Sequence, residues 1–194
     1  MIEVEKNFDL KEGDKTRIIK SAVLLEKKCF IDVYYDTKDY KLTGKDYWLR
    51  SRNGKFELKV PLNVGRVLDR VTDQYKELET NEEIASELGL SATDDMKKSL
   101  REKGYAPFAT ITTTRERYKK GDFNLDFDEM DFGFTAFEVE LMVQAPKQIP
   151  AAEKRILKFG TDHNIAPISA GKVIEYLRRY KPEHLAFLKT SGIA

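Results

Sequence analysis

Hydrophobic and polar residues alternate with a period of two in several segments of the chain, and this pattern is typical of β-strands. Asn53-Gly54 favours a tight hairpin turn between two of these segments, and Gly121-Asp122 separates two others. Residues 61–71 lack the alternation and are expected to form a loop. The strands predicted in this way cover residues 2–8, 30–35, 47–52, 56–60, 74–79, 108–119, 123–128 and 137–143.

Helical segments lie between and after these strands. Thr80, followed by Glu83, provides a capping box at the start of one helix, and Gly104 follows the end of another. The expected helices cover residues 14–26, a stretch from 80 onward, 93–103, 150–162, 170–180 and 183–189. Strands that occur in runs, with helices attached to them, predict an α+β fold with a mostly antiparallel sheet.

The overall composition narrows the class of partner. A length of 194 residues suits a single domain over residues 1–194 with a sizeable core. Charged residues make up 35% of the chain, yet the formal net charge is only +1. A general nucleic-acid binder would carry a basic excess, so nucleic acid is not an expected partner. The balance instead suits a site in which cations and anions are separated locally.

The cysteine count and the lack of long apolar runs indicate the cellular compartment in which the protein is expected. Cys29 is the only cysteine, which excludes an intrachain disulfide and favours a reducing environment. No apolar run approaches the length of a membrane span, and the acidic, strand-like start of the chain is unlike a signal peptide. We therefore expect a cytoplasmic protein that does not associate with a membrane.

Pairs of like charges recur on the polar faces of the strands. Any one pair is well explained by a face that meets water. The repetition is harder to explain, because same-face neighbours lie roughly 6 to 7 Å apart and a surface selected for solubility mixes the two signs. The pairs are Glu3 and Glu5, Arg50 and Arg52, Glu77 and Glu79, Arg115 and Arg117, Asp126 and Asp128, and Glu138 and Glu140.

A sheet that closes into a barrel with these faces inward would form a charged internal channel, and the helices would cover its apolar outside. Arginine and lysine would bind phosphate oxygens, while carboxylates would offer hard ligands for Mg²⁺ or Mn²⁺. A polyphosphate with its metal ion would satisfy both groups and offset the cost of enclosing them. The expected phosphate wall is Arg50, Arg52, Lys59 and Arg115, and the expected metal wall is Glu3, Glu5, Asp126, Glu138 and Glu140.

The chain resembles the CYTH, or triphosphate-tunnel, family in nine short motifs that follow one another along nearly its whole length. Within that family it is most similar to the thiamine triphosphatases. Each motif is weak alone, and their shared order carries the resemblance. The motifs are Ile2-Glu3-Val4-Glu5, Tyr34-Tyr35-Asp36-Thr37, Tyr47-Trp48-Leu49-Arg50-Ser51-Arg52, Glu57-Leu58-Lys59-Val60-Pro61, Tyr75-Lys76-Glu77-Leu78, Leu125-Asp126-Phe127-Asp128, Asp131-Phe132-Gly133-Phe134, Glu138-Val139-Glu140 and Gly171-Lys172-Val173-Ile174-Glu175-Tyr176-Leu177.

The resemblance implies a closed eight-stranded antiparallel β-barrel with helices packed outside it. It implies Mg²⁺-dependent hydrolysis of thiamine triphosphate to thiamine diphosphate and phosphate, with inorganic triphosphate as the alternative substrate and adenylyl cyclase activity as a weaker match. It gives the two walls the roles described above and adds Lys172 to the phosphate contacts. It also implies that Trp48 stacks on the organic group, although an ordinary core position is the alternative reading.

One position departs from the family pattern. The family's E-x-E-x-K motif places a lysine at position 7, where this chain has Asn7. The adjacent Lys6 points to the other face of a regular strand. Either the substrate-binding site works with Asn7 and one cation fewer, or a β-bulge turns Lys6 inward. The substitution also leaves open a protein that binds a triphosphate without hydrolysing it.

Hydrolysis needs a water molecule that is oriented or deprotonated for in-line attack. The sequence leaves three candidates for this role: a metal-bound water, the carboxylate of Glu77, and Lys59 with a pKa depressed by neighbouring arginines. His163 and His184 lack metal-ligand spacing and are expected to be structural or surface residues. A closed barrel has no free strand edge, so a monomer is expected.

Overall fold

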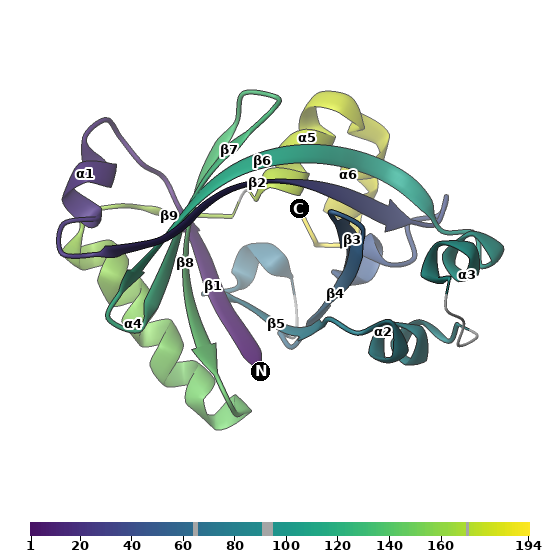
Figure 1. The fold of residues 1–194 in the computed structure, drawn as a ribbon, viewed down its shortest axis with the longest axis horizontal. Helices are drawn as coiled ribbons and strands as arrows, with labels where there is room; N and C mark the ends of the chain where they lie inside the picture. The colour runs from purple at the N-terminus through teal and green to yellow at the C-terminus, as the bar shows by residue number, and fades with distance from the viewer. Residues whose placement is uncertain (64–65, 91–94, 170) are drawn as a thin grey trace.

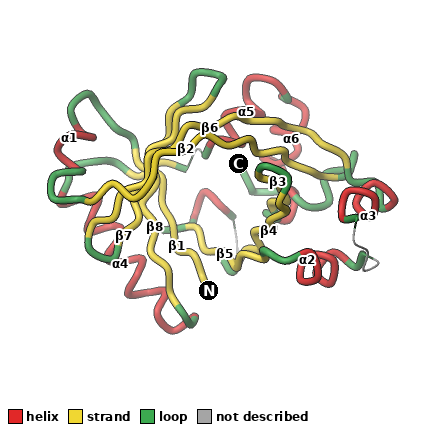
Figure 2. The backbone as a smooth tube through the Cα atoms, viewed as in Figure 1, coloured by secondary structure: helices red, strands yellow, loops and turns green. Residues whose placement is uncertain are grey.

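The computed structural model of the protein describes residues 1–63, 66–90, 95–169 and 171–194. Long antiparallel strands dominate it, and α-helices and short 3₁₀-helices connect or follow them (Figures 1 and 2). The strands are β1 (Ile2–Phe8), β2 (Val23–Asp36), β3 (Trp48–Arg52), β4 (Lys55–Pro61), β5 (Asp73–Leu78), β6 (Ala106–Lys120), β7 (Phe123–Met130), β8 (Thr135–Val143) and β9 (Pro167–Ile168). The helices are α1 (Asp14–Ile18), η1 (Thr43–Lys45), η2 (Val67–Asp69), α2 (Asn81–Leu88), α3 (Met96–Glu102), η3 (Pro146–Gln148), α4 (Ile149–Asp162), α5 (Lys172–Tyr180) and α6 (Pro182–Thr190).

Eight strands form a closed barrel. Their order is β5-β4-β3-β2-β6-β7-β8-β1, and β1 pairs with β5 to complete the circuit. This last pairing runs from Ile2 opposite Lys76 to Glu5 opposite Asp73. Each of these pairings is antiparallel, and β9 adds a two-residue pairing at the end of β1. The expectation of a closed eight-stranded antiparallel barrel is confirmed.

Helices cover the apolar outer faces of the strands. Val4, Leu125 and Val139 are fully buried beneath Ile156 and other apolar side chains of α4. α4 lies so close to β1 that a Cβ on Gly160 would come within 2.4 Å of the Phe8 ring. On the other side of the barrel, α2 and α3 cover β3 and β4 (Figure 1). The polar faces of these strands are therefore left pointing into the barrel.

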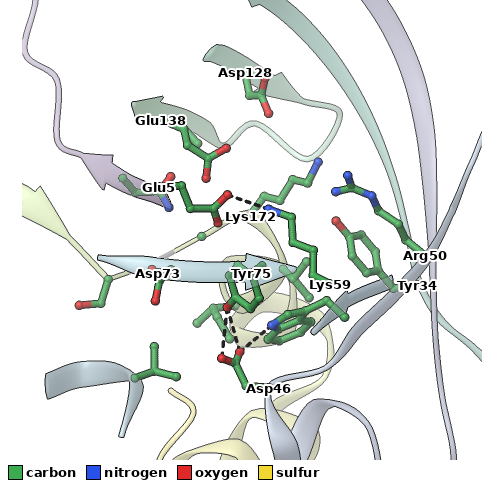
Figure 3. A pocket seen from close by; sticks show the side chains of 18 of the residues that line it. Glu5, Tyr34, Asp46, Arg50, Lys59, Asp73, Tyr75, Asp128, Glu138 and Lys172 are labelled. Atoms are coloured by element: carbon green, nitrogen blue, oxygen red, sulfur yellow. Dashed lines mark hydrogen bonds and ion pairs between the residues drawn. The ribbon is translucent and has the colours of Figure 1, made fainter. Parts of the chain in front are cut away.

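Helices α5 and α6 pack near one end of the channel. Val173 and Tyr176 of α5 contact the cluster around Tyr34 and Ile111, which are residues of β2 and β6. Leu188 of α6 belongs to an adjoining apolar cluster that also contacts the partly buried indole of Trp48. This packing brings the start of α5, with Lys172, toward the interior of the barrel (Figure 3). No helix in the described residues is long and apolar enough to cross a membrane.

The predicted helix over residues 14–26 is wrong beyond its first turn. α1 ends at Ile18, and β2 already begins at Val23 and continues to Asp36. The difference arises because residues 23–30 pair with the equally extended end of β6, a non-local contact that local periodicity does not report. The other predicted helices include three residues outside the described part of the chain: Thr93, Asp94 and Ala170. The loop predicted over residues 61–71 contains the short helix η2.

The long β2 strand also leaves one edge unpaired within the described part of the chain. Residues Asp32 to Tyr35 pair with β3, whereas Val23 to Phe30 pair with β6 alone. The prediction of a monomer from the absence of free edges therefore loses its premise. A register shift between Leu24 and Glu26 and the exposed Lys27 are features that hinder edge-to-edge association.

Candidate functional site

A pocket inside the barrel contains most of the residues predicted for the phosphate wall. Arg50, Lys59, Arg115 and Lys172 line it together with Trp48 and Asn7 (Figure 3). Lys172 comes from α5, and the other residues come from β1, β3, β4 and β6. On each of these strands, alternate residues face the interior of the barrel. Arg52 does not line this pocket. Its guanidinium lies 4.0 Å from the centre of the Phe30 ring and binds Asp32.

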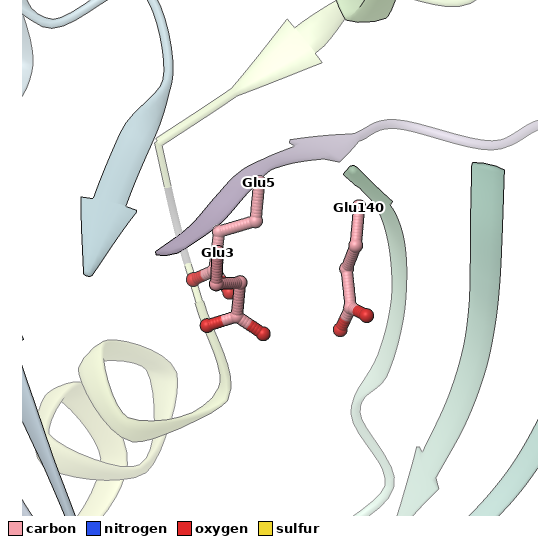
Figure 4. Close-up of side chains that lie close together, drawn as sticks. All are labelled: Glu3, Glu5 and Glu140. Carbon is pink, nitrogen blue, oxygen red and sulfur yellow. The ribbon is translucent and has the colours of Figure 1, made fainter. Parts of the chain in front are cut away.

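The predicted metal wall forms a contiguous group of carboxylates on three neighbouring strands. Glu5 lies opposite Glu140 in the β1–β8 pairing, and Asp126 lies opposite Glu138 in the β7–β8 pairing. Carboxylate oxygens of Glu3, Glu5 and Glu140 lie within 4.8 Å of one another (Figure 4). The same holds for Asp126, Glu138 and Glu140, so Glu140 belongs to both groups. Both sets consist only of oxygen donors, and this chemistry suits a hard divalent cation.

The electrostatics of these acids are consistent with a place for a cation. Burial, and then the charges of Glu138 and Glu3, raise the pKa of Glu5 well above its usual range. Burial, followed by the charges of Glu3 and Asp126, does the same to the pKa of Glu140. Glu3 differs: burial is the largest single influence and raises its pKa, but the ion pair with Lys59, the hydrogen bond with Glu5 and the charge of Arg50 together lower it to about 2. A divalent cation would favour the charged form of all these carboxylates.

The cations do not form a wall separate from the acids. Lys59 contacts Glu3, and its Nζ lies 2.7 Å from Glu5 Oε2 and 3.9 Å from Glu77 Oε1. Arg115 donates to both carboxylate oxygens of Asp128, at 2.6 and 2.7 Å, and also contacts Asp126. The expected separation of charges is therefore only partial, because each of these cations holds carboxylates from neighbouring strands.

The surroundings of Lys59 do not support its predicted role as a base. The sequence suggested arginine neighbours and a depressed pKa, but the nearest charged groups are the carboxylates of Glu3, Glu5 and Glu77. Burial alone would lower the pKa of Lys59, yet these carboxylates raise it well above its usual range. Burial and the charge of Glu3 raise the pKa of Glu77, which keeps this carboxyl group as a candidate base.

Two residues of the site were given no role from the sequence. Asp32 is fully buried on β2 and accepts hydrogen bonds from Arg52 at 2.8 Å and from Lys172 at 2.7 Å. It faces inward by strand alternation, so the period-two pattern could have identified it. Arg117 was recognised only as the same-face neighbour of Arg115, and it binds Asp126 and lies 3.2 Å from Glu140. Glu79, by contrast, lies on a face that meets water, where it is exposed beside Lys55.

Trp48 is held by a carboxylate from the preceding turn. Its Nε1 donates to Asp46 Oδ1 at 2.7 Å, and the Tyr75 hydroxyl donates to the same oxygen at 3.0 Å (Figure 3). Arg70 forms an ion pair with the other oxygen of Asp46. Asp46 and Arg70 lie outside the regular strands, so no periodic pattern pointed to them. The indole is partly buried and lines the pocket beside Arg50.

The structure decides between the two expectations for position 7. β1 pairs with β8 in unbroken register from Ile2 to Phe8, so no bulge turns Lys6 inward. Asn7 lines the pocket and lies opposite Glu138. Lys6 is buried on the other face of the strand. The pocket therefore has an amide where the family pattern has an ammonium group.

Two curated relatives match this chain over nearly its whole length. The chain is 31% identical to the thiamine-triphosphatase of Macaca fascicularis over 95% of this chain and 87% of the relative. It is also 31% identical to the human thiamine-triphosphatase, over 94% of this chain and 87% of that protein.

A solved structure and a family match extend the comparison. The PH1819 protein from Pyrococcus horikoshii OT3 superimposes with a TM-score of 0.68 at 19% identity, covering 91% of this chain and 99% of that one. This likeness supports the fold alone. The CYTH domain matches residues 1–170, which include every strand of the barrel. The chain therefore belongs to the CYTH domain family.

Proposed function

We propose that the protein hydrolyses thiamine triphosphate to thiamine diphosphate and phosphate in a Mg²⁺-dependent reaction. The observation that carries the proposal is the placing of an indole, Trp48, beside Arg50 in a pocket that also holds Lys59, Arg115 and Lys172. The cations suit a chain of phosphates, and the aromatic ring suits an organic cation at its end. The relatives named thiamine-triphosphatase support the same substrate.

The basic residues would bind and orient the triphosphate. The guanidinium groups of Arg50 and Arg115 suit the charge and geometry of phosphate oxygens, and Lys59 and Lys172 add point charges. Binding would draw these side chains from their present carboxylate partners toward the phosphates. Positioning and charge stabilisation are the main requirements of phosphoryl transfer, and this set of side chains supplies both.

The acidic residues would hold the metal ion. Glu3, Glu5, Asp126, Glu138 and Glu140 form the two overlapping oxygen-donor groups, which suit Mg²⁺ and also Mn²⁺. When bound, such an ion withdraws charge from phosphate oxygens. Glu77, with its raised pKa, is the protein group that we assign to orienting or deprotonating the attacking water.

The same geometry suits a second substrate. The phosphate and metal residues would be equally suited to inorganic triphosphate, which makes no use of Trp48. We therefore give inorganic triphosphatase activity as the alternative. We also propose that the enzyme acts in the cytoplasm and forms one domain over residues 1–194. We further propose a monomer, now because the register shift and the exposed Lys27 hinder pairing at the free edge of β2.

Parallel phosphate-release assays test the proposal. Purified protein would be incubated with Mg²⁺ and thiamine triphosphate, inorganic triphosphate or ATP, and kcat/KM compared. We expect the highest value for thiamine triphosphate. Release from inorganic triphosphate alone would support the alternative and contradict the proposal. Tight binding without release from any of the three would indicate a binding protein.

A further inference from the structure

Asp46 occupies an unusual position at the edge of the pocket. It follows η1, is 2% exposed, and has a φ of 64°, in the left-handed region. Aspartate tolerates this conformation better than most residues, but it still carries a conformational cost. A buried charge in such a conformation persists only where the surrounding contacts hold it.

The two oxygens of Asp46 bind side chains, two of which line the pocket, and no backbone N–H of its own loop donates to them within the described residues. Trp48 and Tyr75 donate to Oδ1, at 2.7 and 3.0 Å, and Arg70 forms an ion pair with Oδ2 (Figure 3). Asp36, at the start of the same loop, instead binds the backbone of the loop itself. Its oxygens accept hydrogen bonds from the backbone N–H groups of Thr37, Leu42 and Thr43. Asp36 thus shapes the loop, whereas Asp46 connects it to the pocket.

The contact with Trp48 has a consequence for the ring. An indole has a single polar atom, which is a donor, and Asp46 holds it. Rotation of the ring about its side-chain torsions would break this hydrogen bond. The ring also contacts the apolar cluster around Leu177 and Leu188, so it is held both at its N–H and by packing. A ring fixed before binding has no ordering cost to meet when a ligand stacks on it.

We propose that Asp46 is a positioning residue that fixes the Trp48 indole in the pocket wall and so sets the preference for an organic over an inorganic triphosphate. The inference rests on the proposed function, in which Trp48 contacts the organic group. Asp46 itself would touch neither the phosphates nor the metal ion. Its effect should therefore appear in substrate preference and in the mobility of the indole.

The mobility of the indole can be measured without any substrate. Trp48 is the only tryptophan in the sequence, so fluorescence excited selectively at the long-wavelength edge of the indole band reports this ring alone. Asp46→Ala should lower the fluorescence anisotropy and raise acrylamide quenching by about twofold, because the N–H loses its charged acceptor. Asp46→Asn keeps an acceptor oxygen for the indole N–H but loses the ion pair with Arg70, so both quantities should change less than in Asp46→Ala.

A distant variant controls for lost stability. Thr80→Ala removes the N-cap hydrogen bond of α2, in which Thr80 Oγ1 accepts from the Glu83 N–H at 3.2 Å. It should lower the melting temperature without altering the Trp48 fluorescence. Unchanged anisotropy and quenching in Asp46→Ala would overturn the positioning role, whatever the enzyme hydrolyses.

Steady-state kinetics with the two substrates provide a second, independent test. Asp46→Ala should raise KM for thiamine triphosphate by about fivefold to tenfold and KM for inorganic triphosphate by less than about twofold, as expected for one charge-assisted hydrogen bond. In a Trp48→Phe background, which has no N–H to position, Asp46→Ala should add little further change. An equal rise for both substrates would overturn the proposal. If wild-type protein does not hydrolyse thiamine triphosphate, the proposed function fails and the fluorescence arm still decides the role of Asp46.

Discussion

Lys59 Nζ lies 2.7 Å from Glu5 Oε2 and also contacts Glu3, so one ammonium group connects the residues proposed to bind phosphate with those proposed to hold the metal ion. Removing this charge should affect both. We expect Lys59→Met to lower kcat/KM by about a hundredfold for thiamine triphosphate and for inorganic triphosphate alike. Steady-state kinetics would measure the loss. Lys55→Met, on the same strand but exposed, is the matched control and should change little.

Trp48 distinguishes the two candidate substrates. Trp48→Ala should lower kcat/KM for thiamine triphosphate by about tenfold or more, since stacking with a desolvated cation contributes roughly 1 to 2 kcal/mol. The value for inorganic triphosphate should change by less than about twofold, because no organic group is present. Trp48→Phe, which keeps a ring, serves as the control. Equal losses with both substrates would show that the ring only packs.

Position 7 offers a gain-of-function test. Asn7 lines the pocket opposite Glu138, so Asn7→Lys would add a cation where the family pattern has one. We expect KM for both triphosphates to fall by about threefold to tenfold, through an added charge-assisted contact with phosphate. Lys6→Met is the control, because that side chain lies on the other face of β1. An unchanged or raised KM for Asn7→Lys would show that the pocket does not use a cation here.

Glu140 is shared by the two oxygen-donor groups, so its loss should weaken metal binding most directly. We expect Glu140→Gln to reduce the affinity for Mg²⁺ or Mn²⁺ by about tenfold to a hundredfold, because a neutral amide replaces a charged ligand. Isothermal titration without substrate would measure this. Glu129→Gln, on the exposed face of β7, is the control. Identical isotherms for Glu140→Gln and wild type would contradict the assignment.

His184 should make the stability of the fold depend on pH. It is 3% exposed, and its Nε2 lies 2.8 Å from Thr43 Oγ1. Burial lowers the pKa of His184 to about 4 from a usual value of 6.5. Because the folded-state pKa is the lower one, the unfolded chain takes up the proton first. The free energy of unfolding should therefore fall as the pH drops from about 6.5 to about 4, by at most about 3 kcal/mol.

Urea unfolding at pH 7 and at pH 4.5 would test this. Other groups also titrate in that interval, so the informative quantity is the difference between wild type and His184→Gln. The glutamine variant should lose less stability between the two pH values. A loss equal to that of wild type would show that His184 does not contribute.

The sequence predicted the strands best where neighbouring strands repeat the same alternation. In β7 and β8, apolar residues such as Leu125 and Val139 alternate with Asp126 and Glu138, so the pattern identified both the core and the inward-facing acids. The start of β2 was missed because residues 23–30 are strand only through their pairing with β6. That pairing joins segments far apart in the chain, and local propensity contains no record of it.

The candidate site, too, was predicted only in part. The metal-wall residues came from strand periodicity and the family resemblance, and the structure brings all five together. The mixing of cations with acids was not predictable, because it depends on which strands become neighbours. Asp46 and its contact with Arg70 were not predicted, because turns and loops carry no periodic signal; Arg70 was expected to be a solvated loop residue or a guide for the anionic substrate. Their partnership exists only once η1 and the segment after η2 meet beside β5.

The position of β1 in the barrel has a consequence for synthesis. This strand precedes every other strand of the barrel in the chain, yet it pairs with β5 and with β8, which ends at Val143. Glu3 and Glu5 must therefore wait for most of the chain before they meet Glu138 and Glu140. Such long-range pairing slows folding and leaves β1 exposed in the nascent chain. The two oxygen-donor groups that share Glu140 are therefore absent from any nascent chain that ends before β8.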